Sequence, residues 1–243
     1  MSEFSSTELL ITVIARLLRG CRLVAVGASS PIPGAGALLA RTQSHEPMRV
    51  TVLGSLRHEG FTSGGVELFD MAAQGRIDAF FLGGGQIDGQ ANINLVGTGE
   101  YPNNEVRWPG CFGSSYLYFL VPRVILFREE HSRRVMVPKV DFISAPGVSE
   151  PGVHRQAGPY AMLTELGLFS FDRERRRFRL DSVHPGRSVQ EIRDNTGFEF
   201  DCPERVPITA PPDASTLSAV RGAVRSDIAG TYPRFASRLG AAA

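Results

Sequence analysis

The chain has 243 residues, of which 42% are hydrophobic and 21% are charged, and its formal net charge is +1. A chain of this length and composition can bury a substantial core, either as one large α/β domain or as two small ones. The near-neutral charge argues against nucleic acid as the main partner, because that mode of binding normally requires an excess of basic residues.

The sequence indicates neither a membrane span nor a disulfide framework. The longest apolar run is interrupted by Pro122 and Arg123, so we expect no segment to cross a membrane. The N-terminus lacks the basic region and the apolar block of a secretory signal. Cys21, Cys111 and Cys202 show neither CxxC spacing nor an even number for pairing. We therefore expect reduced thiols in a bacterial-type cytoplasm, with no metal site.

The N-terminal segment has the signals of a helix followed by a strand. Ser5 and Glu8 have the spacing of a capping box, in which a hydroxyl and a carboxylate satisfy each other's free backbone amides. Apolar residues then recur at helical spacing, and Gly20 ends the helix. The apolar run at 23–26 predicts a buried strand, and a loop rich in Gly, Ala and Pro at 27–36 leads into a second helix.

The same alternation continues as far as residue 82. Residues 50–53 and 79–82 are predicted strands, and residues 66–74 are a predicted helix that ends at Gly75. Short apolar strands that alternate with helices are typical of an α/β sheet with helices on both faces.

The remainder of the chain is predicted to be rich in strands, including the run 116–127. Aromatic and polar residues alternate on either side of the segment 172–177, which predicts a β-hairpin with a charged tip. A functional interpretation assigns this basic tip to the phosphates of a nucleotide-like ligand, but the interleaved acids favour a solvated turn. Asp213 is expected to cap a final helix, after an ordered Pro-rich connector at 203–212.

A run of three glycines, Gly83 to Gly85, directly follows the predicted strand 79–82. In open α/β sheets, ligands bind where loops leave the carboxyl ends of the strands. Consecutive glycines let the backbone approach a ligand and present its amides to negative charge. The run matches neither a P-loop nor a convincing dinucleotide motif. Taken alone, it is equally compatible with a tight structural turn.

Several ordered segments resemble the β-subunits of class I CoA-transferases, closest to the glutaconate CoA-transferase type. Residues 83–88 (GGGQID) with 92–94 (NIN) resemble that family's GGAQID…GNVN segment. Residues 110–114 stand where the family has its GxGGA loop, and 140–147 resemble its DYVTSPG segment. Three further matches follow in the same order, at 167–172, 184–186 and 195–200. The resemblance covers nearly the whole chain.

This resemblance implies an α/β fold, a three-layer α/β/α sandwich of the CoA-transferase (NagB/RpiA-like) type, in a single domain over residues 1–243. It also implies an α-subunit partner of similar fold, in a heterodimer or heterotetramer, with the active site at their interface. The substrate would be a coenzyme A thioester, and no cofactor would be bound permanently. Family members pass an acyl group from CoA to a glutamate carboxylate, which divides a difficult exchange into easier steps.

The resemblance further implies that glycine loops supply N–H donors to the oxyanion at the thioester carbonyl, each donor contributing about 3 kcal/mol. The residues that it assigns to these CoA and oxyanion loops are Gly83, Gly84, Gly85, Gln86, Asp88, Asn92, Asn94, Gly110, Gly113 and Ser114.

The chain departs from the family at the nucleophile. The position of the usual glutamate falls on Leu53 or Gly54, neither of which can attack a thioester, and the segment from there to Gly83 is short. Glu59 is the nearest carboxylate that could substitute as the catalytic residue. The simpler interpretation is a solvated loop glutamate.

Three other residues near the matched segments are weaker candidates for a role in the active site. Cys111 lies in the second glycine loop, but nothing in the sequence indicates a base that activates it. Phe112 replaces a glycine of the family pattern, so this loop is expected to close less readily on a substrate. His184, before Pro-Gly, is expected to be a structural turn residue and not an acid or base.

The leading hypothesis is the β-subunit of a heteromeric CoA-transferase-family enzyme whose essential carboxylate comes from the α-subunit, with transfer or hydrolysis left open. One alternative is a subunit of a CoA-dependent ring-opening hydrolase of steroid-type catabolism. Another is a non-catalytic subunit that supports an α-chain. A standalone small-molecule binding protein is least expected, because the family's site is built across two chains.

Overall fold

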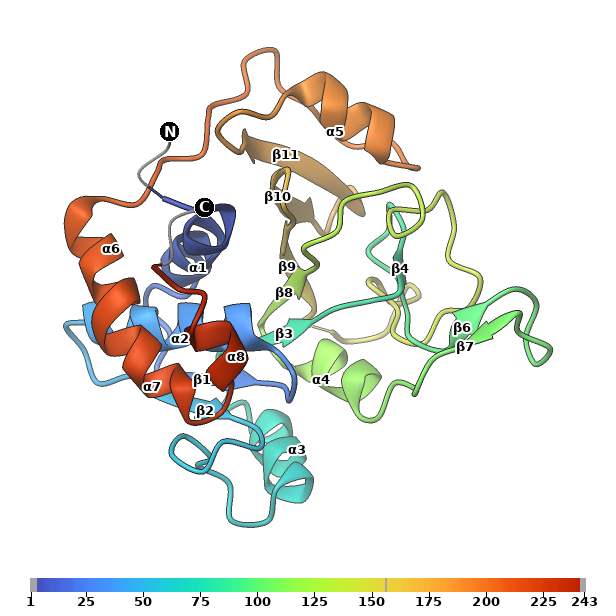
Figure 1. Cartoon of the computed structure of the whole chain (residues 1–243). Coiled ribbons are helices and arrows are strands. Elements are labelled where there is room, and N and C mark those ends of the chain that lie inside the picture. The colour runs from blue at the N-terminus through green and yellow to red at the C-terminus, as the bar shows by residue number, and fades with distance from the viewer. Residues whose placement is uncertain (1–3, 156, 241–243) are drawn as a thin grey trace. The chain divides into compact units, whose positions relative to one another are not determined.

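The computed structural model describes residues 4–155 and 157–240, and Figure 1 shows the course of the chain. These residues form two compact units: one contains the residues up to Phe81 together with those from Ala210 onward, and the other contains Leu82–Thr209. Both units combine helices with strands, as the α/β prediction requires. The assignment of one domain to residues 1–243 stays a prediction.

The first unit is built on three parallel strands in the order β3-β1-β2, namely β3 (Ala79–Leu82), β1 (Leu23–Val26) and β2 (Arg49–Val52). The crossover helices are α2 (Pro31–Gln43) and α3 (Gly65–Ala73). The connections β1–β2 and β2–β3 run in opposite directions across the strands. Right-handed crossovers therefore place α2 and α3 on opposite faces, as Figure 1 shows. This unit has the predicted helix–sheet–helix layering.

The first helix, α1 (Ser6–Leu17), begins with the predicted capping box. Ser5 N donates to Glu8 Oε2 at 2.8 Å, and Glu8 N donates to Ser5 Oγ at 3.2 Å. These two hydrogen bonds satisfy backbone amides that the helix itself leaves without partners.

The second helix begins earlier than predicted, because α2 includes Pro31–Gly36, which the sequence assigns to a loop. Proline is well tolerated at the first position of a helix, where its missing N–H is not needed. Gly36 is required for close packing: a Cβ there would lie 2.4 Å from Ile14 Cγ2 of α1. The glycine at position 36 is therefore explained by close packing of α2 against α1, and not by a loop.

The predicted cap of the last helical segment is confirmed, since Thr216 N donates to Asp213 Oδ1 at 2.7 Å. The segment is not one regular helix, however. It is divided into α6 (Ala214–Ala219), a π-helical turn η1 (Val220–Val224) and α7 (Arg225–Ala229), and α8 (Pro233–Ala236) follows. None of the described helices combines the length and the apolar character needed to cross a membrane.

The second unit contains four longer strands. β8 (Arg123–Phe127) runs parallel to β9 (Pro159–Leu163), and β9 is antiparallel to β10 (Gly167–Asp172). β10 pairs with β11 (Arg177–Val183), which confirms the predicted hairpin with its tip at 173–176. Phe169 and Phe178 of this hairpin are fully buried. A short helix, α5 (Val189–Asn195), follows β11.

The prediction of strand throughout 116–127 is wrong in its first half, which forms helix α4 (Ser114–Leu120). Leu117 and Val121 are both buried and lie four residues apart, which is helical spacing. Tyr118 Oη donates to Ala91 O at 2.9 Å, a tertiary contact that the sequence pattern does not reveal. Pro122 then prevents the helix from continuing.

Two short antiparallel pairs complete the second unit. β4 (Gln86–Ile87) pairs with β5 (Ile93–Asn94), and β6 (Gly97–Thr98) pairs with β7 (Val106–Arg107). Both pairs lie between β3 and α4 in the chain (Figure 1). The β4–β5 pair belongs to the first loop that the sequence assigns to the functional site, and the second loop follows β7 in the chain.

Candidate functional site

The first predicted loop, Gly83 to Gly85, is a close-packed turn between β3 and β4. A Cβ on Gly84 would lie 2.7 Å from Gln86 O, and one on Gly85 would lie 2.2 Å from the ring of Trp108. Gly84 and Gly85 are therefore required by packing within the unit. Gly83 is the exposed member of the three, so its backbone is the part of the run that faces solvent.

The polar residues of this segment form a buried hydrogen-bond network. Asn94 Nδ2 donates to Gln86 Oε1 at 2.8 Å and to Gly97 O at 2.7 Å. Gln86 Oε1 also accepts from Asp141 N at 2.9 Å, and Gln86 Nε2 donates to Asp141 Oδ2 at 3.1 Å. Gln86 and Asn94 thus join the first loop to the segment that begins at Asp141.

Asp88 and Asn92 make the second part of the network. Asp88 Oδ1 accepts from the backbone amides of Gln90 and Asn92 at 3.0 and 3.1 Å, and Asp88 Oδ2 accepts from Asn92 Nδ2 at 3.1 Å. Asn92 Oδ1 accepts from Gly147 N at 3.1 Å. Because these side chains are engaged with the chain itself, their clearest physical role is to fix the loop backbone.

Sequence reasoning missed Ser144 as a member of this site. Its Oγ donates to Ile93 O at 2.8 Å and accepts from Leu95 N at 3.0 Å. Ser144 lies in the matched segment 140–147, and that match was the available signal. Its partners lie far away in the sequence, so spacing alone does not reveal them.

The second predicted loop, Gly110 to Ser114, precedes α4 and has an unusual backbone. Gly110 has φ +105° and Phe112 has φ +40°, a left-handed conformation that is rare for a bulky residue. The Phe112 side chain is 85% exposed. Ser114 Oγ is buried and has no hydrogen-bond partner among the described residues. A buried hydroxyl without a partner is costly and is found at sites that bind or react.

The loop after β2 contains the position of the missing nucleophile. Glu59 Oε2 accepts from Gly54 N at 2.7 Å, and Glu59 N donates to Ser55 O at 2.9 Å. The other carboxylate oxygen, Oε1, is buried and has no hydrogen-bond partner among the described residues. Glu59 is thus a half-buried loop residue whose carboxylate closes the turn that begins at Gly54, and a catalytic role for it stays a prediction.

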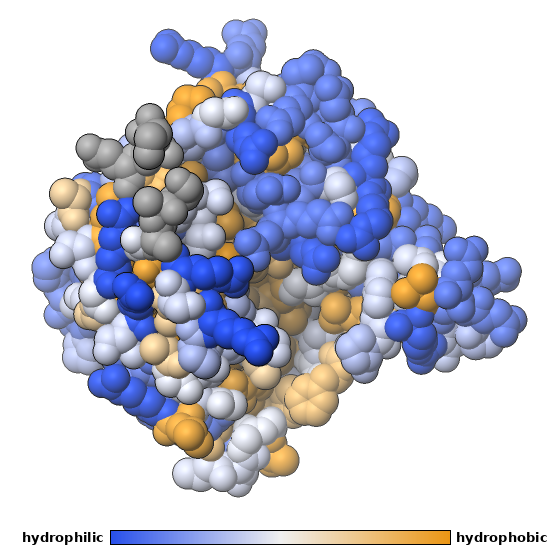
Figure 2. Space-filling view, viewed as in Figure 1, coloured by the Kyte–Doolittle hydropathy of each residue, from blue (hydrophilic) through white to orange (hydrophobic). Residues whose placement is uncertain are grey.

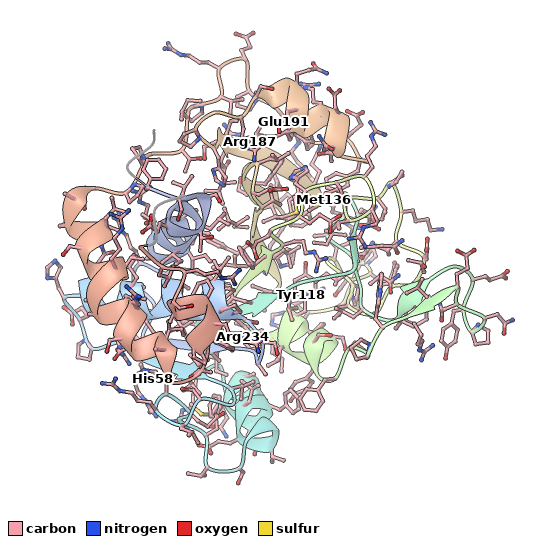
Figure 3. All side chains as sticks on the ribbon, in the orientation of Figure 1. His58, Tyr118, Met136, Arg187, Glu191 and Arg234 are labelled. Atoms are coloured by element: carbon pink, nitrogen blue, oxygen red, sulfur yellow. The ribbon has the colours of Figure 1, made fainter. Side chains whose placement is uncertain are left out.

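Charged residues from distant segments surround this turn in the first unit. Asp227 of α7 pairs with Arg41 at 3.0 Å and with Arg57 at 2.8 Å. His58 Nε2 lies 3.9 Å from Asp227 Oδ2, and His58 is labelled in Figure 3. Burial lowers the pKa of His58, and the charge of Arg41 lowers it further. Sequence reasoning missed this cluster, since Asp227 lies far along the chain from its partners on this loop.

The structure gives neither Cys111 nor His184 the surroundings of a reactive group. Cys111 is a free, half-buried thiol. His184 is buried, with Nδ1 2.8 Å from Thr209 Oγ1 and Nε2 3.0 Å from Thr164 O. Burial lowers the pKa of His184 to about 4. These contacts agree with the structural role expected of this histidine.

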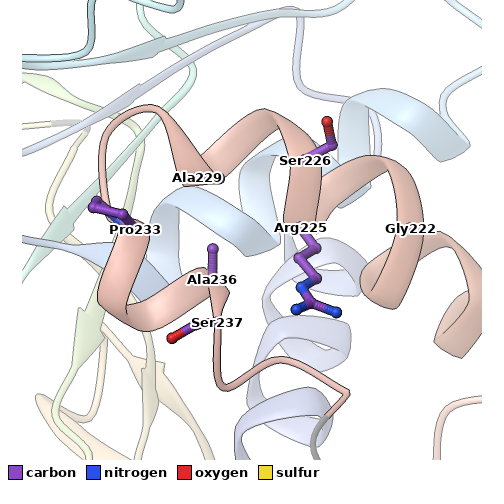
Figure 4. A pocket seen from close by; sticks show the side chains of 7 residues that line it. All are labelled: Gly222, Arg225, Ser226, Ala229, Pro233, Ala236 and Ser237. Atoms are coloured by element: carbon purple, nitrogen blue, oxygen red, sulfur yellow. The ribbon is translucent and has the colours of Figure 1, made fainter.

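The first unit has two pockets, and none of the predicted site residues lines either of them. One, of about 390 Å³, lies on the C-terminal helices between Gly222 and Ser237 (Figure 4). The other, of about 1110 Å³, is lined by residues that precede β1 and β2, among them Arg22 and Met48. It lies at the amino ends of those strands, whereas ligands of open α/β sheets bind at the carboxyl ends.

Apolar side chains are exposed near the second loop. Figure 2 shows apolar surface over α4 and a small apolar patch at the base of the otherwise hydrophilic β6–β7 hairpin. The exposed residues of these segments include Tyr116, Phe119 and Val106. Exposed apolar surface of this kind is typical of contact with another protein or with a ligand. Within 4–155 and 157–240, no group of three His, Cys, Asp or Glu side chains is arranged to hold a metal ion.

Comparison with known proteins identifies similar sequences and structures. The family model described as Coenzyme A transferase matches residues 7–195. The B-type subunit of 3-oxoadipate CoA-transferase from Pseudomonas knackmussii is 31% identical, over 91% of this chain and 94% of that protein. The IpdB subunit of the cholesterol ring-cleaving hydrolase from Rhodococcus jostii is 24% identical, over 91% and 92%. A crystal structure of a variant of the decarboxylase AibA/AibB superposes with a TM-score of 0.76 and 26% identity, over 90% and 95%.

Proposed function

Because this chain belongs to the coenzyme A transferase family and is of its B type, we propose that it pairs with an α-type subunit and that the pair acts on an acyl-CoA thioester. Its similarity to a B-type subunit extends over nearly the full length of both proteins, which supports a B-type role. The exposed apolar side chains of α4 and the β6–β7 hairpin offer a surface for such a partner.

The essential carboxylate of the pair comes from the partner in this proposal. The observation that carries it is the turn after β2, where Leu53 and Gly54, at the expected nucleophile position, carry no carboxylate and the amide of Gly54 donates to Glu59 Oε2 at 2.7 Å. Attack on a thioester requires a carboxylate oxygen that reaches the substrate carbonyl. One oxygen of Glu59 is hydrogen-bonded to the backbone and the other is buried.

The two glycine loops contribute donors to the thioester oxyanion in this proposal. Gly83 supports this role, because its backbone is exposed while its polar neighbours hold the loop rigid. The unpartnered hydroxyl of Ser114 supports a similar role for the second loop, together with Gly110 and Gly113. Rigid donors stabilise developing charge without a cost of reorganisation at the moment of reaction.

A second candidate reaction is hydrolysis of the CoA substrate without exchange of CoA between acids. The absence of a carboxylate at residues 53 and 54 favours it, because transfer of CoA depends on a covalent acyl intermediate at a glutamate. The similarity to a ring-cleaving hydrolase subunit and to a decarboxylase also supports a reaction other than transfer.

We place the enzyme in the cytoplasm, a location supported by the three free cysteines.

The site of the covalent chemistry can be located by mass spectrometry. The co-expressed pair is incubated with an acyl-CoA, treated with borohydride, and each chain is weighed. We expect the mass of this chain to be unchanged, with any reduced adduct on the partner. We also expect Glu59→Gln to retain activity within about threefold, because the amide oxygen of glutamine can still accept from Gly54 N. An adduct on Glu59, or loss of activity by about a thousandfold in that variant, would assign the nucleophile to this chain.

A further inference from the structure

A groove of about 550 Å³ lies in the second unit, at the turn between β4 and β5. Four segments form its walls: the turn between β4 and β5, residues 138–143, the tip of the β10–β11 hairpin, and residues 198–199. Its lining includes Asp88 and Asn92, which the sequence assigns to the CoA loop. The groove is thus continuous with a segment of the proposed active site.

The hairpin wall of this groove is fixed in place. Arg175 and Arg177 both pair with Asp201, and Arg177 Nε lies 3.0 Å from Asp201 Oδ1. The backbone amides of Glu174 and Arg175 donate to Asp172 Oδ1 at 3.0 and 2.9 Å. A wall held by these contacts needs little ordering when a ligand binds. This part of the tip is the structured turn that the interleaved acids predict.

Two cationic side chains of the groove have no partner among the described residues. Lys139 and Arg176 are exposed, and neither has an ion pair or a hydrogen bond among the residues that the structure describes. Arg177 Nε is buried and has no hydrogen bond despite its closeness to Asp201, because the N–H is not directed at the carboxylate. The groove therefore holds donors and positive charge that the protein itself does not satisfy.

The acidic groups that face these cations are accounted for, apart from one. Asp201 is paired with two arginines, and the oxygens of Asp88 accept hydrogen bonds from the β4–β5 turn. Glu199 is exposed in the lining and is the one acid there, among the described residues, that would oppose an anion. The remaining balance of charge in the groove is positive, which favours a phosphate-bearing ligand.

The groove also has apolar side chains that suit a nucleobase. Ile143 and Phe198 both line it, and the side chain of Ile143 is about half exposed. The strand β4 connects the glycine loop at Gly85 to the turn at Gly89, so these two points lie at most roughly 14 Å apart along an extended chain. The pantetheine arm of CoA is a linear chain of comparable length.

We infer that this groove binds the phosphorylated nucleotide end of the acyl-CoA substrate, with Lys139 and Arg176 as the phosphate-binding side chains. The inference rests on the proposed function, since it assigns the groove to the same substrate. Phe198 and Ile143 provide the apolar contact for the base, and the thioester end extends along β4 toward Gly83. The groove thereby anchors the part of the substrate that does not react.

The direct test is calorimetric titration of the purified chain with adenosine 3′,5′-bisphosphate, the nucleotide end of CoA without its arm. We expect the double variant Lys139→Gln/Arg176→Gln to weaken binding about tenfold, since each exposed charge contact contributes modestly. Glu199→Gln should tighten binding about twofold. Arg205→Gln is the matched control, an exposed arginine outside the groove, and should leave the affinity unchanged. Equal binding by the unaltered chain and all three variants would overturn the inference.

A kinetic test separates this inference from the proposed function. The co-expressed pair is assayed with an acyl-CoA and with the same acyl group on N-acetylcysteamine, which lacks the nucleotide. We expect the double variant to raise KM about tenfold for the acyl-CoA only. An active pair in which KM does not change would overturn the inference and leave the proposed function intact, even if the bisphosphate binds. A pair that turns over no acyl-CoA would overturn the proposed function, and the titration would still test the groove.

Discussion

Gly54 is one of the two residues, with Leu53, on which the family pattern places a nucleophile, and its backbone amide donates to Glu59 Oε2 at 2.7 Å. Glu59 can be identified from the sequence because it is the nearest acid along the chain. The surroundings of this turn cannot be identified in the same way. Thr231 donates to Ser55 Oγ across 176 positions, and Asp227 reaches the same loop from α7. A local sequence pattern therefore identifies Glu59, but it does not reveal the distant residues that contact its loop.

Gly85 tests whether the first glycine loop is held by packing. A Cβ there would lie 2.2 Å from the Trp108 ring, so Gly85→Ala should destabilise the fold by about 1–3 kcal/mol. Gly222→Ala is the control, because nothing lies within 4 Å of a Cβ at that position; its effect should be neutral or stabilising by less than about 1 kcal/mol. Urea unfolding measures both. Equal effects would show that Trp108 does not constrain the loop.

Among the elements, those with local causes are the ones that the sequence predicts well. The capping box at Ser5, the cap at Asp213 and the β10–β11 hairpin each depend on residues close together in the chain, and all three are confirmed. The start of α2 and the helix α4 were missed, and each packs against a residue that lies far away in the sequence. Ile14 requires a glycine at position 36, and Tyr118 is held by Ala91 O.

A histidine buried between two elements carries a stability effect that the sequence does not indicate. Thr196 Oγ1 donates to Ile192 O at 2.7 Å, so it accepts from His131 Nε2 at 2.9 Å. Burial lowers the pKa of His131 to about 4, so the imidazole is neutral near pH 7. Its Nδ1 then accepts from Thr164 Oγ1 at 2.8 Å, a closer contact than the 3.4 Å from that hydroxyl to Gly167 O. This histidine joins the end of β9 to the end of α5.

His184, at the end of β11, has the same arrangement. Its Nε2 donates to Thr164 O at 3.0 Å, because a carbonyl can only accept, and its Nδ1 accepts from Thr209 Oγ1 at 2.8 Å. A second proton on Nδ1 would require the Thr209 hydroxyl to turn its own proton toward Ser182 Oγ, 2.7 Å away, and burial lowers the pKa of this imidazole to about 4. Both histidines of this region are thus built into the fold in the neutral form.

These two histidines predict that the fold loses stability in mild acid. Their folded pKa values of about 4 lie below the value of about 6.5 for an unfolded chain. As the pH falls from 6.5 to 4, the unfolded chain takes up protons that the folded chain does not. The free energy of unfolding should fall by up to about 3 kcal/mol for each histidine over this range.

Urea unfolding at pH 7, 6 and 5 measures this effect. The variant His184→Gln, which cannot be protonated, should show a shallower dependence on pH than the unaltered chain. A free energy of unfolding that is the same at pH 7 and pH 5 would contradict the assignment of neutral buried histidines.

For the whole molecule, the order of matched segments along the chain is what the sequence reveals most securely. Short glycine-rich and polar motifs in a fixed order indicate the family, and the match over residues 7–195 confirms it. The same motifs do not reveal that Gln86, Asp88, Asn92 and Asn94 bind one another and residues 140–147. Family membership can thus be predicted from a single sequence. Which side chains fix the loop backbone, and which remain free to contact a substrate or a second subunit, depends on the three-dimensional structure.

The account as a whole rests on a site that is incomplete without a second subunit. Turnover of an acyl-CoA by this chain alone, by an α-type subunit alone and by the co-expressed pair tests that claim most directly. We predict that only the pair turns over the substrate at an ordinary enzymatic rate. Turnover at such a rate by this chain in isolation would contradict the account.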